Sequence, residues 1–321
     1  LRVIARAGSK PDQVHSNDTL ITWINVRPII SEIPYLATFE AGPMGWYSEG
    51  TRNEWEHGKP QGLLLDRTPD GSYAWGTDLD GTHENYSYSF LYSPCFDLRQ
   101  AAADPIMSFD YRLNLEDGLD FLWIEMSLDG GDWAHIGTSQ SGVANWYNHH
   151  SDAWTGTSHA WQTAAHILTG SQGHIARFRY VLFTDGTFNR EGVLLDRVML
   201  RYEYDLAISE ITPTDVCDMS LGLHETITAS VLNQGYYDIN LFDIRYKVDN
   251  QSFNLFERFQ GAIPSGQAHT FSFTQPANLS SPGAHFIEVD AQMPGDVLQA
   301  NNLKQSRSGN VTAPVIDLGN D

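Results

Sequence analysis

The sequence has few cysteines, few lysines and no long apolar run. Two cysteines in 321 residues exclude a disulfide-rich scaffold and a cysteine-based zinc cluster. No apolar run approaches the roughly 18 residues of a membrane-spanning helix, so we expect no membrane span. Only 19 basic residues stand against 40 acidic ones, and the resulting net charge of −21 repels phosphate backbones. Nucleic acid is therefore not expected as a partner. Scarce lysine beside abundant Asp, Asn, Ser, Gly and Thr favours a secreted protein.

The sequence also lacks the common motifs of hydrolases and nucleotide-binding enzymes. It contains no His-Glu-X-X-His, no Gly-X-Ser-X-Gly and no P-loop. The acids of segment 116–125 offer paired carboxylates of the kind that glycosidases use, but solvated turns explain most of them. His149 and His150 are adjacent, so on a strand they point to opposite faces and do not easily share one metal ion. We therefore expect no enzymatic activity and assign no catalytic residue.

Helical periodicity is nearly absent, and short alternating segments take its place. The best helical candidates are 98–103 and a turn near 162–168. Elsewhere, apolar and polar residues alternate over strand-length segments that end at Gly, Asn, Asp or Pro. Examples are 106–112, 121–127, 175–183 and 193–200, with a Gly-Gly hairpin at 127–133. The pattern predicts an all-β protein built from β-sandwiches.

The positions of two prolines and the start of a new series of strand patterns predict the domain boundaries. Pro28 and Pro34 bracket a stiff linker, and a new series of strands begins at Asp205. We predict a first sandwich over residues 34–204, a second over 205–310 and a linker over 311–321. Cys95 and Cys217 then fall in different domains. We expect a reduced thiol at Cys95, and a bridge between the two stays open.

The first residues of the chain echo a later segment. When Pro11 is aligned with Pro294, residues 2–18 and 285–302 both give an alternating strand, a turn, a valine and a terminal Asn-Asp or Asn-Asn. Residues 1–33 are therefore predicted to hold the closing strand pair of a preceding immunoglobulin-like module and a linker. The same echo predicts a tandem array with a period of 283 residues, the separation of the two prolines. Chance similarity is the alternative.

Two regions resemble known families of secreted bacterial surface proteins. The first resembles MAM-like jelly-roll domains, on the motifs Phe39-Glu-Ala-Gly42, Gly45-Trp46, Ala74 to Gly81, Leu91 to Leu98, Ser127 to Gly131, Asn145 to Asn148, Trp154 to Gly156 and Leu195 to Val198. Relatives more often carry two adjacent acids before that valine, where Arg197 stands here. The second resembles adhesion-related (CARDB-like) immunoglobulin-like modules, on Asp205 to Ile208, Thr226 to Gly235, and Asp296 through Asn301-Asn302. The resemblance implies a jelly-roll sandwich followed by an immunoglobulin-like sandwich.

Four acids are candidate ligands for calcium, which prefers six to eight oxygen ligands. The first and last strands of a jelly roll lie side by side, so Glu40 and Asp196 are expected to converge. Asp78 and Asp80 are two apart and share one strand face, and Gly81 follows them. We predict a structural calcium site from these four residues. The alternative is that Glu40 lies on the surface and the Asp-Gly pair is only a turn.

One aromatic stretch is the candidate ligand-binding surface. Trp146, Tyr147, His149, Trp154 and Trp161 fall within sixteen residues among Asn, Ser and Gly, and flat rings of this kind stack on sugars. The alternative is that two or three of these tryptophans belong to the core. Trp75 and Trp123 lie in alternating strands and are expected to be core residues.

These features predict a non-enzymatic, secreted surface protein with structural calcium that acts in adhesion. Its partner would be a cell-surface glycan or protein, or neighbouring copies of the same module. The alternative function is a carbohydrate- or substrate-binding accessory region of a larger secreted hydrolase.

Overall fold

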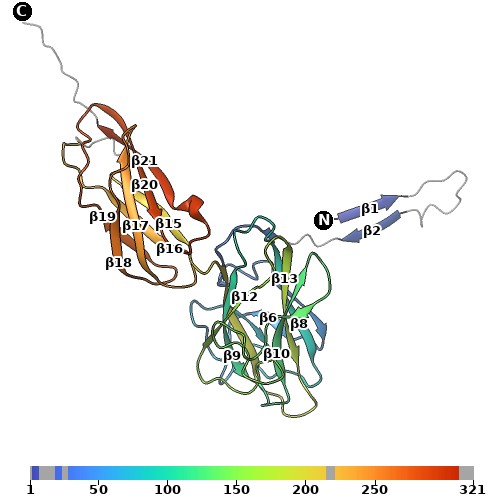
Figure 1. Cartoon of the computed structure of the whole chain (residues 1–321). Helices are drawn as coiled ribbons and strands as arrows, with labels where there is room; N and C mark the ends of the chain where they lie inside the picture. Colours follow the sequence, from blue (N-terminus) through green and yellow to red (C-terminus); the bar gives the residue numbers. More distant parts are fainter. Residues whose placement is uncertain (1, 7–18, 24–27, 215–220, 311–321) are drawn as a thin grey trace, which may run out of the picture.

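The computed structural model describes residues 2–6, 19–23, 28–214 and 221–310, and these residues form two β-sandwiches and one separate hairpin (Figure 1). The predicted all-β class is confirmed. Over the described ranges the single helix is a 3-10 turn, Gln299–Asn301, and no helix is long and apolar enough to cross a membrane. Cys95 is half-buried, and Cys217, Pro11 and the predicted linker 311–321 lie outside the described residues.

The first sandwich consists of two six-stranded sheets. One sheet has the order β11-β10-β13-β8-β3, and β5 also pairs with β8. The other has the order β12-β9-β14-β7-β6, and β4 also pairs with β14. All pairs are antiparallel except β3 with β8. The strands are β3 (Ile29–Ile30), β4 (Tyr35–Ala37), β5 (Tyr47–Thr51), β6 (Trp55–Gly58), β7 (Ala74–Thr77), β8 (Tyr88–Asp97), β9 (Ile106–Asn114), β10 (Phe121–Leu128), β11 (Ala134–His135), β12 (Gln162–Ile167), β13 (Ile175–Phe183) and β14 (Gly192–Arg201).

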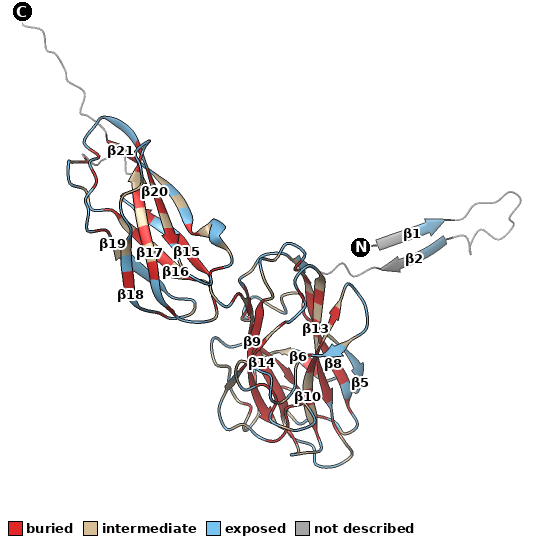
Figure 2. Cartoon of the chain, viewed as in Figure 1, coloured by how far each residue is buried: buried red, intermediate tan, exposed pale blue. Residues whose placement is uncertain are grey.

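The two sheets meet in an aromatic core. Phe109 of one sheet packs edge-on against Tyr180 of the other, with ring centroids 4.9 Å apart. One cluster of buried side chains takes residues from both sheets, and many residues of these strands are coloured as buried in Figure 2. Period-2 alternation explains this arrangement, because every second residue of a strand faces the partner sheet. Residues 162–167, a helical candidate in the sequence, form strand β12, because Ala164 and His166 are buried against β9.

The second sandwich has a three-stranded sheet, β15-β16-β19, and a four-stranded sheet, β18-β17-β20-β21. Its core is separate from the first one and runs from Leu206 to Ala291. The strands are β15 (Leu206–Thr212), β16 (Thr228–Asn233), β17 (Ile239–Val248), β18 (Glu257–Ile263), β19 (Ala268–Ser272), β20 (Gly283–Gln292) and β21 (Leu303–Asn310). Seven strands in sheets of three and four match the size of an immunoglobulin constant-type sandwich.

The predicted N-terminal strand pair is present. Strands β1 (Arg2–Arg6) and β2 (Thr19–Trp23) pair in antiparallel fashion, with Arg2 opposite Trp23 and Arg6 opposite Thr19. Neither strand pairs with another strand of the described ranges. Ile4 and Leu20 are exposed. That this strand pair closes a preceding immunoglobulin-like module stays a prediction.

Candidate functional site

The aromatic stretch singled out in the sequence is mostly core. Trp146, Tyr147 and Trp154 keep 3%, 5% and 0% of their surface exposed, so the prediction that they stack on a sugar is wrong. Their polar atoms are also satisfied inside the protein. The indole of Trp146 donates to the Ile136 carbonyl at 2.8 Å, and that of Trp154 donates to the Asn145 carbonyl at 3.0 Å. The polar neighbours of these rings have the pattern of a binding surface. In the structure, backbone carbonyls, among them that of Asn145, accept the hydrogen bonds of the buried indoles.

The other two residues of that stretch are half-buried and lie apart. Trp161 packs against Leu65, Leu79 and Leu194, and its indole nitrogen donates to a backbone carbonyl at 3.2 Å. His149 lies against the ring of Phe121, with centroids 5.3 Å apart. Of the five predicted ligand-binding residues, only His149 lies beside the concave aromatic site described next.

An aromatic surface covers the outward side of the sheet β5-β8-β13-β10-β11. We call it the aromatic face. The register aligns one row across all five strands: Tyr47, Tyr92, Arg179, Glu125 and His135. Strand alternation places the other outward rings in neighbouring rows. The aromatic residues of the face are Tyr47, Tyr88, Phe90, Tyr92, Phe121, Trp123, Trp133 and Phe183.

Two arginines lie between the rings at one end of the aromatic face. The guanidinium carbon of Arg179 is 4.4 Å from the ring centre of Phe90 and 4.5 Å from that of Trp133. Arg177 covers Tyr92 in the same way at 4.8 Å. Each such contact contributes roughly 0.5–2 kcal/mol. These guanidinium groups occupy the ring faces that a ligand would need, so this end of the face is closed.

Glu125 links the closed end to Trp123. Its Oε2 accepts a hydrogen bond from Arg179 Nε at 2.6 Å, and its Oε1 accepts one from the Trp123 indole nitrogen at 2.8 Å. The Trp123 ring also stacks on His135, at 5.7 Å and an interplanar angle of 14°. The indole is therefore fixed in orientation before any ligand arrives.

The open end of the aromatic face is a concave site of about 270 Å³, which we call the aromatic hollow. It is lined by Phe121, Trp123, His135, Ser151, Ala153 and Phe183. Phe183 is 40% exposed, so its ring is accessible. Ser151 and Ala153 come from the loop that the buried Trp154 fixes to β10, since the backbones of Trp154 and Leu122 exchange hydrogen bonds of 2.7 and 2.9 Å. The core tryptophans thus position one wall of the hollow.

Sequence reasoning missed this site because it placed Trp123 in the core. The residues at 121, 123 and 125 share one face of β10, and Phe121 and Trp123 are half-buried there, whereas Leu122 and Ile124 between them are fully buried. A signal was present, since Glu125 follows Trp123 at the spacing of one strand face and a carboxylate needs a polar partner. Arg179 of β13 supplies that partner.

The four candidate calcium ligands do not form one group. Strand β7 pairs with β14 so that Leu194 lies opposite Gly76 and Leu195 opposite Trp75. Asp78 therefore lies four positions along the strand from the level of Asp196, about 13 Å away. Asp78 and its neighbour Asp80 form a turn in which Asp78 has a φ of 49°. In the described part of the chain, no three His, Cys, Asp or Glu side chains are placed to hold a metal ion together.

Asp196 and Glu40 are the two candidates whose charges act on each other. Asp196 is fully buried, its Oδ1 accepts the Arg197 N–H at 2.7 Å, and its Oδ2 has no hydrogen-bond partner. Burial, against the effect of that N–H, raises the pKa of Asp196 to about 7, and the charges of Asp110 and Glu40 add to it. Glu40 is exposed and accepts two backbone N–H bonds. The charge of Arg197 lowers the pKa of Asp196, but Arg197 is also paired with Asp110.

A Ser-His-Asp arrangement lies in the second sandwich and was not foreseen. His285 Nδ1 is 2.8 Å from Asp249 Oδ2, and His285 Nε2 is 3.3 Å from Ser281 Oγ. The same Nε2 is 3.0 Å from the Ser281 carbonyl oxygen. A nitrogen that donates to a carbonyl carries a proton, so it does not accept the serine proton as a general base does. The geometry describes a charged histidine that ties a loop to β20.

No protein-family model matches the chain. The sequence is 26% identical over 178 residues to Bacillopeptidase F of Bacillus subtilis (strain 168). That match takes in 55% of this chain and 11% of the relative, so the chain spans a small part of that protein. Among solved structures, the glycoside hydrolase domain Spr0440, Endo-D, of Streptococcus pneumoniae R6 shares 11% identity with a TM-score of 0.31, over 83% of this chain and 37% of that one. A glycosyl hydrolase family 2 member of Bacteroides cellulosilyticus shares 7% with a TM-score of 0.27, over 82% and 36%. Structural matches this weak carry no argument about function.

Proposed function

We propose that this chain is a binding region within a larger secreted hydrolase and that its aromatic hollow binds carbohydrate. The observation that carries the proposal is the hollow itself, an open aromatic concavity on the outward face of a sandwich sheet. The similarity to a part of Bacillopeptidase F supports a place beside a catalytic domain. Adhesion, the main expectation from the sequence, has no comparable site behind it.

Carbohydrate fits the hollow better than a flat or charged ligand does. Aromatic faces bind the apolar face of a sugar ring, and a few polar groups at the rim fix its orientation. Trp123, Phe121 and Phe183 supply the apolar walls, and His135 and Ser151 supply the polar groups. At about 270 Å³ the hollow is slightly smaller than the roughly 300–1,000 Å³ of drug-sized pockets. It therefore fits one or two sugar rings.

A binding assay on matched variants tests the proposal. A glycan array with the whole chain identifies the ligand, and calorimetry then gives its Kd. Trp123→Ala and Phe183→Ala should each weaken binding at least about fivefold, if a sugar on an aromatic ring contributes about as much as the roughly 1–3 kcal/mol of a stacked base. Phe286→Ala, an exposed aromatic on the second sandwich, is the control and should bind normally. Unchanged binding by Trp123→Ala would overturn the proposal.

Calcium is a second part of the proposal, as a structural ion. Asp196 and Glu40 would hold it, and an ion there would neutralise the buried carboxylate whose Oδ2 has no partner. Binding of this kind stabilises the folded state by about 2.7 kcal/mol at one hundred times the Kd. Melting of the chain with calcium and with chelator, in wild type and in Asp196→Asn, tests it. Equal midpoints in the wild type would remove calcium from the proposal.

A further inference from the structure

The connection between the two sandwiches is short and bonded on both sides. The hydroxyl of Tyr202 accepts a hydrogen bond from the Ala102 N–H of the first sandwich at 3.1 Å. The Tyr202 carbonyl accepts the Tyr236 N–H of the second at 2.8 Å. Gly235 must be glycine here, because a Cβ would lie 2.7 Å from the Asp205 nitrogen. The connection is thus held by hydrogen bonds to both sandwiches and is not a loose linker.

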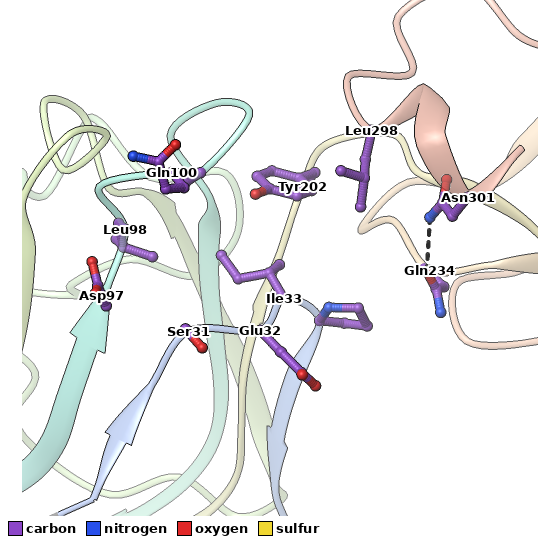
Figure 3. A pocket seen from close by; sticks show the side chains of 12 residues that line it. Ser31, Glu32, Ile33, Asp97, Leu98, Gln100, Tyr202, Gln234, Leu298 and Asn301 are labelled. Carbon is purple, nitrogen blue, oxygen red and sulfur yellow. Dashed lines mark hydrogen bonds between the residues drawn. The ribbon is translucent and has the colours of Figure 1, made fainter.

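A cleft of about 600 Å³ lies at this connection (Figure 3). Leu98 of the first sandwich, Tyr202 of the connection and Leu298 of the second sandwich line it. Gln234 and Asn301 line the side that belongs to the second sandwich and are hydrogen-bonded to each other at 3.1 Å. Of the residues discussed next, Asn301 lines this cleft, and the others lie behind its wall.

Two carboxylates and two amides meet behind that wall. Asp205 Oδ1 accepts the Asn301 side-chain N–H at 2.7 Å. Asp296 Oδ2 accepts the Asn302 side-chain N–H at 2.9 Å and the Leu206 backbone N–H at 3.0 Å. Asp205, Asp296 and Asn302 are at least 95% buried. The two pairs are adjacent, because Asp205 precedes Leu206 and Asn301 precedes Asn302.

Three oxygens of this group have no hydrogen-bond partner. They are Asp205 Oδ2, Asn301 Oδ1 and Asn302 Oδ1, and each is inaccessible to solvent. A buried acceptor without a donor costs about 1–3 kcal/mol, and more when it is charged. Burial raises the pKa of Asp205 to about 6, against the hydrogen bond from Asn301, and the charge of Asp296 raises it further. Burial therefore disfavours the charged form of Asp205, and one of its two carboxyl oxygens has no hydrogen-bond donor.

We propose that Asp205, Asp296, Asn301 and Asn302 form a site for a divalent oxygen-seeking cation, with calcium as the natural fit. Carboxylate and amide oxygens are the ligands that calcium prefers, and further oxygens, from water or backbone carbonyls, would complete six to eight ligands. The cation would neutralise both carboxylates and bond to the orphaned oxygens. Because Asp205 begins the second sandwich directly after Tyr204, an ion here would stiffen the junction between the two sandwiches. The site is distinct from Asp196 and Glu40, which belong to the first sandwich.

Terbium is a suitable probe, because it binds calcium sites and emits when nearby tyrosines are excited. Tyr204 lies close to this group, since a Cβ on Gly295 would be 3.3 Å from its ring. The junction variants are made on an Asp196→Asn background, which removes the calcium site proposed in the first sandwich. On that background the whole chain should give terbium emission that calcium displaces. Adding Asp205→Asn should abolish the emission and weaken calcium binding at least about tenfold by calorimetry, because affinity follows the charge count of the ligands.

A second variant keeps the test decisive if Asp205→Asn does not fold. Asn302→Ala leaves both carboxylates in place and removes one oxygen ligand, so it should also weaken calcium binding about tenfold. Circular dichroism verifies the fold of each variant. Terbium emission that persists in both junction variants would overturn the proposal. So would an Asp196→Asn chain with an intact junction that binds no calcium. A melting temperature of the chain that changes with pH but not with calcium would also overturn it, and would indicate that a proton, not a cation, neutralises the buried carboxyl group.

Discussion

Replacing Asp196 by Asn should stabilise the first sandwich at high pH when calcium is absent. The pKa of this carboxyl is raised from 3.8 to about 7. One pKa unit corresponds to about 1.4 kcal/mol, so a rise of about three units makes the ionisation of Asp196 in the folded state cost roughly 4 kcal/mol at most. The folded state binds the proton more tightly than the unfolded chain. The wild type should therefore lose this stability as the pH rises from about 4 to 7, and Asp196→Asn should not.

The assay is urea unfolding in chelator at pH 5 and pH 8, followed by tryptophan fluorescence. All nine tryptophans precede residue 162, so none belongs to the second sandwich. Trp23 belongs to the hairpin and the other eight to the first sandwich, so the fluorescence change reports mainly that sandwich. Asp132→Asn changes an exposed acid of the hairpin after β10 and serves as the control. A loss of stability in Asp196→Asn at pH 8 would refute the reasoning, since it would mean that the ionised carboxylate is favourable where it lies.

Three further predictions follow from the same structure. Trp154→Ala should cost about 3–5 kcal/mol in urea unfolding because its ring is fully buried, whereas Trp123→Ala should cost clearly less; equal losses would contradict their assignments. Burial disfavours charged His285, but its hydrogen bond with Asp249 and those with backbone carbonyls raise its pKa. The contribution of charged His285 to the stability of the second sandwich should be complete below about pH 6.5 and vanish as the pH rises through the higher pKa of the folded state. The stability of this sandwich, measured by hydrogen exchange, should therefore lose this pH dependence in His285→Gln. Deleting residues 1–27 should leave the first sandwich's melting unchanged in calorimetry, because β1 and β2 pair with no other described strand; a large drop would show that the hairpin packs on it.

Strand alternation carried most of the fold prediction. Segments 106–112, 121–127, 175–183 and 193–200 all lie within strands β9, β10, β13 and β14. The Gly-Gly hairpin is also confirmed, since Gly130 has a φ of 75° that favours glycine. Period-2 patterns are local, so one sequence is enough to recognise them.

The site could not be predicted with the same success, because alternation separates two faces of a strand without saying which one is inside. Trp123 and Ile124 are both apolar, and only the partner sheet decides that Ile124 is buried. The error with Trp146 and Trp154 has the same origin. Their neighbours looked like a binding surface, yet the backbone carbonyls of those neighbours bond the indoles inside the core.

The calcium prediction from the sequence failed in part because the register of strand pairing decides which acids come together. Two acids on one strand face are visible in a sequence, but the distance between two strands' acids depends on pairing that sequence alone does not give. Pairing of β7 with β14 separates Asp78 from Asp196, while Asp205 and Asn301 meet across 96 residues. Long-range pairing therefore decides which oxygens can share an ion.

The most direct test of the aromatic hollow is an amide and indole NMR spectrum of the chain during titration with the glycan found on the array. The side chain of Trp123 lines the hollow and its indole N–H donates to Glu125, whereas the indoles of Trp146 and Trp154 are bonded within the core. Our account predicts a saturable shift of the Trp123 indole signal at the calorimetric Kd, with the two core signals unmoved. Saturable binding that leaves the Trp123 signal in place would contradict it.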